Sequence, residues 1–215
     1  MTSKEVRARI EETGIVAAVR VYSEEEAFFA AEAVGAGGIP VVEITLTVPR
    51  ATEVIGHLAK KNSHIVVGAG GVTDTVVARQ CLDAGAQFLT SDGLHPAVIE
   101  FAVKQDVIVF PGALTPTEVM TAWEAHSDFV KVVPCSQIGG ETYIASLHRM
   151  FPHIPLIAAG GVGQRNAAKF IFAGATAIGI GRELLPPEAL RHRQAGRISN
   201  LARRFLSYVK SGREH

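Results

Sequence analysis

The sequence predicts a single (β/α)8 TIM barrel over residues 1–215, and three observations support this fold class. Eight short apolar runs alternate with eight amphipathic stretches, which is the number of strands and helices in a closed parallel barrel. Turns at 35–37, 84–86 and 173–175 each place glycine between a helix and a strand, where glycine permits a left-handed cap. A length of 215 residues also suits one such barrel.

The predicted strands are short and rich in aliphatic residues, as expected for parallel strands that are buried on both faces. In chain order they cover residues 15–20, 41–46, 65–69, 87–91, 107–110, 129–133, 156–159 and 176–181. Ser23, Thr73-Asp74 and Thr115-Pro116 are typical of helix starts. The predicted helices cover residues 23–34, 50–61, 74–83, 96–104, 115–125, 141–150, 164–172 and 188–211.

The composition argues against several kinds of partner and location. Lys+Arg and Asp+Glu each number 21, so no charge excess indicates a nucleic acid or a membrane partner. The chain opens with no recognisable signal peptide, and no apolar stretch approaches the ~20 residues of a membrane span. Cys81 and Cys135 lack metal-like spacing, so we expect reduced thiols in a cytoplasmic protein.

Lys131 interrupts the apolar run 129–134, which otherwise reads as a buried strand. A buried ammonium is costly unless it is paired or loses its proton, and only the neutral amine can attack a carbonyl to form a Schiff base. The alternative is a strand-end lysine whose head reaches water. Glu43 interrupts the core strand 41–46 in the same way, so the two residues are either a catalytic pair or a structural ion pair.

Other candidate ligands lie where the strands end, because functional groups of such barrels lie at the carboxyl ends of the strands. Gly160-Gly161 and the segment 179–181 end the last two strands, where backbone N–H groups commonly bind phosphate. Arg182 could add a charge-assisted bond, and Arg20 is a second candidate anion ligand at the end of the first strand. The alternatives are that these glycines only form simple turns and that Arg20 is an exposed loop residue without a ligand.

At these residues the chain resembles the class I aldolases for 2-keto-3-deoxy-6-phosphogluconate and 4-hydroxy-2-oxoglutarate. The resemblance covers nearly the whole length and implies that Lys131 forms the Schiff base while Glu43 shuttles protons. It also implies a homotrimer. The motifs that carry it lie at 42–49, 67–72, 110–112, 130–134, 159–162 and 178–181.

The chain departs from this family in the region that binds the pyruvate carboxylate. Many members have arginine at the position of Thr47 and threonine at that of Gly71. Members with threonine at the first position often carry an arginine at the end of strand one, which matches Arg20. We therefore expect Arg20 to bind the carboxylate, with help from Thr47 and from backbone N–H groups around Gly70 and Gly71.

Further departures affect the rest of the rim. The usual Ser-Pro after strand four is Ser91-Asp92 here, with Ser91 kept as a candidate substrate ligand. Family members have a threonine before the glycines of strand seven, where this chain has Ala159. They have a pair of small residues after strand eight, where this chain has Arg182-Glu183; Gly181, just before this pair, is kept as a candidate substrate ligand. Arg182 would attract a phosphate and Glu183 would repel it.

The leading hypothesis is a metal-independent class I aldolase that needs no cofactor, because the imine itself accepts the electrons and no His/Asp/Glu cluster resembles a metal site. It would cleave one or both family substrates to pyruvate plus glyceraldehyde 3-phosphate or glyoxylate. The alternatives are a Schiff-base aldolase for another, unphosphorylated 2-oxo acid, a non-catalytic ligand-binding barrel, and a different phosphate-binding barrel such as an isomerase.

Overall fold

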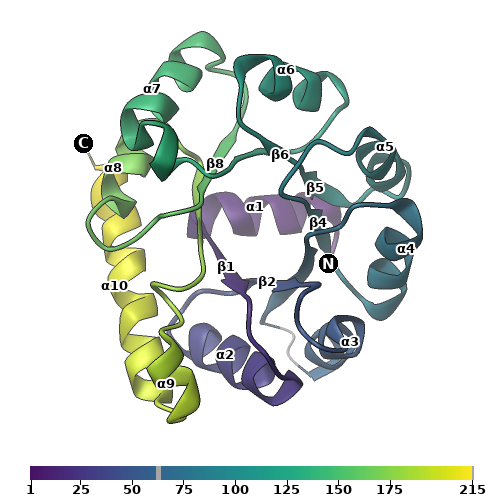
Figure 1. The fold of residues 1–215 in the computed structure, drawn as a ribbon, viewed down its shortest axis with the longest axis vertical. Coiled ribbons are helices and arrows are strands. Elements are labelled where there is room, and N and C mark those ends of the chain that lie inside the picture. The colour runs from purple at the N-terminus through teal and green to yellow at the C-terminus, as the bar shows by residue number, and fades with distance from the viewer. Residues whose placement is uncertain (62–63, 215) are drawn as a thin grey trace.

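A parallel sheet wraps round into a barrel in the computed structural model, which describes residues 1–61 and 64–214 (Figure 1). Across these residues the sheet has nine strands in the order β5-β4-β3-β2-β1-β9-β8-β7-β6, and neighbouring strands pair in parallel. The strands are β1 (Ile15–Val19), β2 (Val41–Thr45), β3 (Val66–Gly70), β4 (Phe88–Thr90), β5 (Ile108–Phe110), β6 (Gly112–Ala113), β7 (Val130–Val132), β8 (Leu156–Ala159) and β9 (Ala177–Ile180).

The barrel closes through one strand that Pro111 divides into β5 and β6. Proline has no N–H to donate, which interrupts a ladder. The carbonyl oxygen of Pro111 still accepts a bond from the backbone N–H of Lys131 at 2.9 Å, and that of Val109 accepts from Asp128 at 2.9 Å. Because β5 pairs with β4 while β6 pairs with β7, the two pieces act as the fifth strand, and the predicted eight-stranded barrel is confirmed.

The outer helices begin with side-chain caps where the sequence predicts them. The Ser23 hydroxyl accepts from the N–H of Glu26 at 3.1 Å, the Thr115 hydroxyl accepts from Glu118 at 3.3 Å, and Asp74 caps the helix that follows it. The helices are α1 (Ser3–Thr13), α2 (Glu24–Ala36), α3 (Ala51–Lys61), α4 (Thr75–Ala84), α5 (Pro96–Lys104), α6 (Pro116–Glu124), α7 (Gly140–Met150), α8 (Ala167–Phe172), α9 (Pro187–Arg191) and α10 (Ala195–Arg213), with a 3-10 turn at Ser136–Ile138.

Three local predictions were wrong or incomplete. The single helix expected at 188–211 is divided into α9 and α10, because Arg193 takes a left-handed conformation with φ 49° between them. The left-handed turn after α2 falls on Gly38 with φ 96°, whereas Gly37 stays right-handed at φ −82°. Helix α1 was not predicted.

Helix α1 lies across the far end of the barrel in Figure 1 and closes it. Its two fully buried apolar side chains, Val6 and Ile10, pack into a cluster with Phe88, Phe110 and Phe129 from the strands. The Phe88 and Phe110 rings stack with centroids 5.2 Å apart, and Phe129 meets Phe110 edge-on at 6.0 Å. This end of the barrel is therefore filled with apolar side chains.

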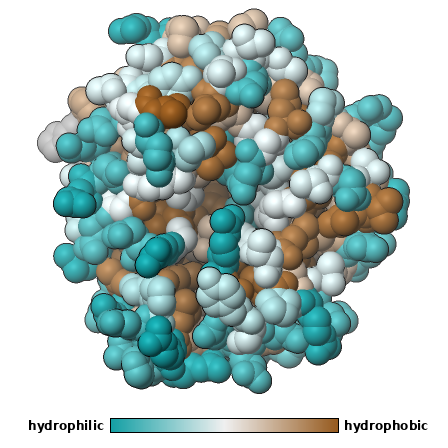
Figure 2. Space-filling model, viewed as in Figure 1, coloured by the Kyte–Doolittle hydropathy of each residue, from teal (hydrophilic) through white to brown (hydrophobic). Residues whose placement is uncertain are grey.

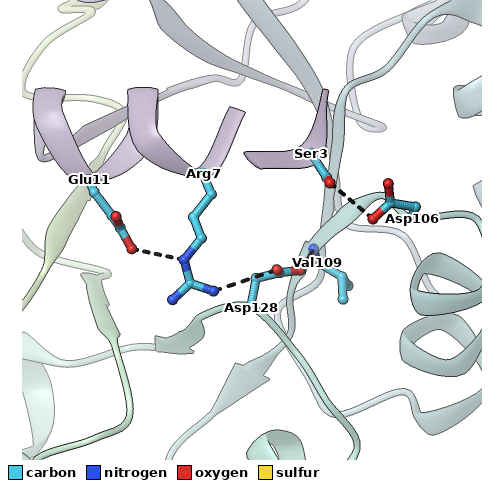
Figure 3. A network of polar contacts seen from close by, with 6 residues as sticks. All are labelled: Ser3, Arg7, Glu11, Asp106, Val109 and Asp128. Carbon is cyan, nitrogen blue, oxygen red and sulfur yellow. Dashed lines mark hydrogen bonds and ion pairs between the residues drawn. The ribbon is translucent and has the colours of Figure 1, made fainter. Parts of the chain in front are cut away.

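Polar contacts hold α1 in this position (Figure 3). The Ser3 hydroxyl donates to Asp106 Oδ1 at 2.9 Å, and Arg7 pairs with Glu11 and with Asp128. The second carboxylate oxygen of Asp128 accepts from the N–H of Val109 at 2.9 Å, which connects Arg7 to β5. These contacts fix α1 over the end of the barrel opposite the one where the strands terminate.

No helix among the described residues is both long enough and apolar enough to cross a membrane. Cys81 and Cys135 are both free and buried, and burial raises the pKa of each thiol to about 11.

Candidate active site

The carboxyl ends of the strands surround a cavity of about 610 Å³. Figure 2 shows this face of the molecule hollowed near its centre, with apolar residues in the hollow and hydrophilic residues around it. The charged residues that line the cavity come from five different strands or the segments after them and from two helices: Arg20, Glu26, Glu43, Asp92, Lys131, Arg182 and Arg191. The cavity thus gathers charges that are far apart in the sequence.

Lys131 lies at the centre of β7 and is only 4% exposed. Its neighbours across the sheet are Gly112 on β6 and Ile157 on β8, so its side chain rises between small and apolar groups. Its Nζ lies 2.8 Å from Oδ1 of Asp92, which offsets the cost of burying the ammonium. The predicted position of Lys131 inside the barrel is therefore what the structure shows.

Glu43 lies at the centre of β2 and is 6% exposed. Burial raises the pKa of its carboxyl; Lys131 acts against this rise, Asp92 adds to it, and Arg20 opposes it. The carboxylate lies directly over Gly70, where any added Cβ would overlap its Oε1 and Cδ atoms. Gly70 therefore provides the space that Glu43 occupies.

Asp92 is the site residue that the sequence analysis missed, since it was noted only as a departure from the family. It follows β4 and joins two cations, with Oδ1 on Lys131 and Oδ2 3.6 Å from Nη2 of Arg20. Burial alone raises the pKa of Asp92, but Lys131 and Arg20 outweigh it and the net shift is downward. Its position at the end of a predicted strand was the signal that could have identified it.

The loop that carries Asp92 is held by its neighbours. The Ser91 side chain is 3% exposed and donates to the carbonyl oxygen of Gly93 at 2.7 Å, so its hydroxyl is used within the loop. A Cβ on Gly112 would overlap the backbone of Asp92 and Gly93. A glycine on β6 thus lets this loop approach Lys131.

The structure brings some of the other predicted ligands into the cavity and leaves others outside it. Gly160, Gly181, Arg20 and Arg182 line it, together with Ala159. Within the described residues, those that do not line it are Thr47, Gly70, Gly71, Ser91 and Gly161.

The structure shows what lies next to Thr47 and Gly71, two of the residues that do not line the cavity. The Thr47 hydroxyl lies 2.8 Å from that of Thr45, which in turn donates to the carbonyl oxygen of Val19. Gly71 has φ +79°, and a Cβ there would meet no heavy atom within 4 Å. Tyr22 and Arg191 also line the cavity and were not predicted, because neither carries a local pattern of its own.

Within residues 1–61 and 64–214, no group of three or more His, Cys, Asp and Glu side chains could hold a metal ion.

A parallel barrel in which a buried lysine and a buried carboxylate line one cavity is typical of barrel enzymes. Comparison with known proteins identifies the family. Residues 6–201 match the family model described as "Aldolase: KDPG and KHG aldolase", and the chain belongs to this family. Its members are aldolases, which makes the protein a carbon–carbon lyase.

Curated relatives match over most of their length. The 2-dehydro-3-deoxy-6-phosphogalactonate aldolase of Escherichia coli (strain K12) is 31% identical over 206 residues, covering 93% of this chain and 95% of the relative. The 2-dehydro-3-deoxy-phosphogluconate aldolase of Treponema pallidum (strain Nichols) is 26% identical over 200 residues, covering 93% and 95%.

Solved structures match the fold closely. A structure titled "Native KDPGal structure" has a TM-score of 0.86 at 28% identity, covering 94% of this chain and 96% of the other. The 2-keto-3-deoxy-6-phosphogluconate aldolase of Zymomonas mobilis ZM4 with 3-phosphoglycerate has a TM-score of 0.86 at 26% identity, covering 96% and 97%.

Proposed function

We propose that the protein cleaves a 4-hydroxy-2-oxo acid by class I aldol chemistry, with Lys131 as the Schiff-base nucleophile and Glu43 as the acid–base group. One observation carries this proposal. Of 21 basic and 21 acidic residues, Lys131 and Glu43 are the two that are buried in the part of the chain described by the structure, and both line the same cavity. Charged groups are almost never buried without a partner or a function.

The reaction follows from the chemistry of these two groups. The neutral amine of Lys131 adds to the C2 carbonyl, and loss of water gives an iminium that can accept electrons. The C3–C4 bond then breaks while the C4 hydroxyl gives its proton to Glu43, directly or through one water. This releases the aldehyde and leaves an enamine of pyruvate, which is protonated at C3 and hydrolysed from Lys131.

The surroundings of Glu43 suit both of its steps. Because burial raises the pKa of its carboxyl, the group can accept a proton from the hydroxyl and hold it for delivery to the enamine carbon. A fully solvated carboxylate would be a poorer proton donor near neutral pH.

We infer that the substrate carries a phosphate. Two cations, Arg182 and Arg191, line the cavity together with Gly160, which has φ +81°. The Glu183 side chain lies against Gly163 and, among the described residues, does not line the cavity. The names of two relatives specify phosphorylated sugar acids, and the Zymomonas structure was obtained with 3-phosphoglycerate. Cleavage would then give pyruvate and glyceraldehyde 3-phosphate.

The test is reduction with borohydride in the presence of pyruvate, followed by peptide mass analysis. We expect an adduct on Lys131, and none in Lys131→Arg. The matched control is Lys169→Arg, which changes an exposed lysine paired with Glu141 on the outer surface and should leave the adduct intact. A folded wild-type protein that gives no adduct at Lys131 would overturn the proposed function.

Substrate choice is tested separately. We expect kcat/KM for 2-keto-3-deoxy-6-phosphogluconate or its galactonate epimer to exceed that for the unphosphorylated sugar acids and for 4-hydroxy-2-oxoglutarate. Higher kcat/KM for the unphosphorylated compounds would favour a different oxo acid as the substrate.

We also infer a homotrimer and a cytoplasmic location. The family resemblance supports the first, and two free thiols support the second. Sedimentation equilibrium tests the assembly, and a mass other than three chains would contradict it.

A further inference from the structure

A second carboxylate contacts the nitrogen atom on which the reaction takes place. Asp92 Oδ1 lies 2.8 Å from Nζ of Lys131, which is hydrogen-bonding distance, and its other oxygen faces Arg20 at 3.6 Å. Glu43 on β2 is close enough to this cluster for the charges of Lys131, Asp92 and Arg20 to act on its pKa. Asp92 is thus the carboxylate with a direct contact to the lysine, whereas Glu43 influences it through the charge alone.

The two carboxylates have different environments. The Asp92 side chain is 57% exposed and its pKa is lowered, since the two cations outweigh burial. Glu43 is buried and its pKa is raised by that burial. Two acids whose environments separate them in this way are suited to two different proton transfers.

We propose that Asp92 is the counter-ion of the Lys131 nitrogen, takes a proton from it during imine formation and gives that proton to the departing hydroxyl, which leaves Glu43 to serve the substrate carbon and the C4 hydroxyl. This assignment rests on the proposed function of Lys131. It adds a catalytic residue at a position where the family usually has proline, and so it concerns this chain in particular.

The steps balance as follows. Asp92 takes a proton from the Lys131 ammonium, and the free amine adds to the C2 carbonyl. One of the two protons on the Lys131 nitrogen, which is now bonded to C2, passes to the former carbonyl oxygen and gives a neutral carbinolamine. Protonated Asp92 then gives its proton to that hydroxyl, water leaves, and the nitrogen lone pair forms the C=N bond. The product is a positive iminium facing an ionised Asp92, and no other reactant is consumed.

Arg20 couples this step to substrate binding. An oxo-acid carboxylate that binds the Arg20 guanidinium competes with Asp92 for the same cation. Asp92 then loses part of the charge that holds it ionised and becomes a stronger base. Substrate binding therefore makes Asp92 a better acceptor for a proton.

The experiment compares Asp92→Asn with the wild-type protein in borohydride trapping with pyruvate, over pH 5 to 9. The Asn side chain keeps the shape and removes the negative charge. At saturating pyruvate we expect the rate of adduct formation to fall about 10²-fold, the lower end of the range for a positioned acid–base group. We also expect the pH profile of adduct formation to change shape, because the Asp92 carboxylate can no longer accept and give a proton.

Three further measurements separate this role from a structural one. Asp92→Glu keeps a carboxylate and should recover part of the rate. Asp106→Asn makes the same change at the opposite end of the barrel, next to Ser3, and should leave rate and profile unchanged. Exchange of the pyruvate methyl protons, divided by the amount of adduct, should be the same in Asp92→Asn and wild type, since that step belongs to Glu43.

The outcomes distinguish this inference from the proposed function. If the wild-type protein forms the Lys131 adduct and Asp92→Asn forms it at the same rate with the same pH profile, the role of Asp92 is refuted while that of Lys131 stands. A wild-type protein without any adduct at Lys131 refutes both.

Discussion

A single added carbon atom at Gly70 should disable Glu43. The backbone of Gly70 lies so close to the Glu43 carboxylate that a Cβ would overlap its Oε1, Cδ and Cγ atoms. The site is enclosed by strands, so the carboxylate must turn away from its present position in Gly70→Ala. Overpacking of this kind costs about 1–3 kcal/mol of stability. At roughly 2–4 °C per kcal/mol for a chain of this size, Tm should fall by about 2–12 °C.

The catalytic effect should be larger than the loss of stability suggests. A displaced acid–base group loses its contribution of about 10²–10⁴-fold, so cleavage by Gly70→Ala should slow by that factor at a temperature where the variant is folded. The Lys131 adduct with pyruvate should still form, because Lys131 lies on β7. The assay is the rate of pyruvate methyl proton exchange divided by the amount of trapped adduct, with aldehyde release measured in parallel.

Two other glycines provide controls. In Gly68→Ala, on the same strand, the added carbon would overlap the Phe88 ring, so the variant should lose stability without displacing the carboxylate. In Gly196→Ala, within α10, the Cβ meets no heavy atom within 4 Å, and a small gain of about 0.5–1 kcal/mol is expected. A folded Gly70→Ala protein with wild-type exchange and cleavage would refute the claim that Gly70 makes room for Glu43.

Further predictions concern the charged groups of the cavity. Lys131→Arg should fold but lose cleavage, because a guanidinium cannot form the imine; retained turnover would contradict the assignment. Glu43→Gln should slow cleavage by roughly 10²–10⁴-fold, and unchanged rates of cleavage and exchange would make Glu43 structural. Since the folded-state pKa of Glu43 is raised, its favourable contribution to stability is complete at low pH and is lost as pH rises through that pKa. Glu43→Gln should therefore unfold at a higher denaturant concentration than wild type at pH 8, and the difference in midpoint should be smaller at pH 4.5. An equal difference at both pH values would show that titration of Glu43 does not affect stability. Arg20→Ala should raise the pyruvate Kd about tenfold or more, read from adduct yield, and an unchanged Kd would place the carboxylate elsewhere.

The barrel could be predicted because its signal is local and repeated. Each buried strand is a short apolar run, and caps such as Ser23 and Thr115 mark the helices that follow. Helix α1 was missed because it precedes the first strand and so lies outside the repeat. Its start did carry a signal, since Thr2 and Glu5 form a reciprocal capping box.

Lys131 and Glu43 could be identified because each is a charged residue within an apolar run. The sequence alone therefore shows that a charged group is buried at a cost. The role of Gly70 could not be found in this way. A glycine carries no side chain to attract attention, and the carboxylate that needs its space comes from another strand, aligned with it only through the register of β2 and β3. Gly70 was predicted to bind substrate, and the structure adds that it lies beneath Glu43.

Asp92 shows why a departure from a family pattern should be considered together with its neighbours. An added carboxylate in a cavity that must bind an anion would by itself repel the substrate. Arg20 lies 3.6 Å from Asp92 and Lys131 lies 2.8 Å from it, so the extra negative charge is shared between two cations. Removing Arg20 therefore has two effects: the substrate carboxylate loses its partner, and Asp92 is left to repel that carboxylate more strongly. Both effects weaken binding, which makes the tenfold increase in Kd expected for Arg20→Ala a lower bound rather than a central estimate.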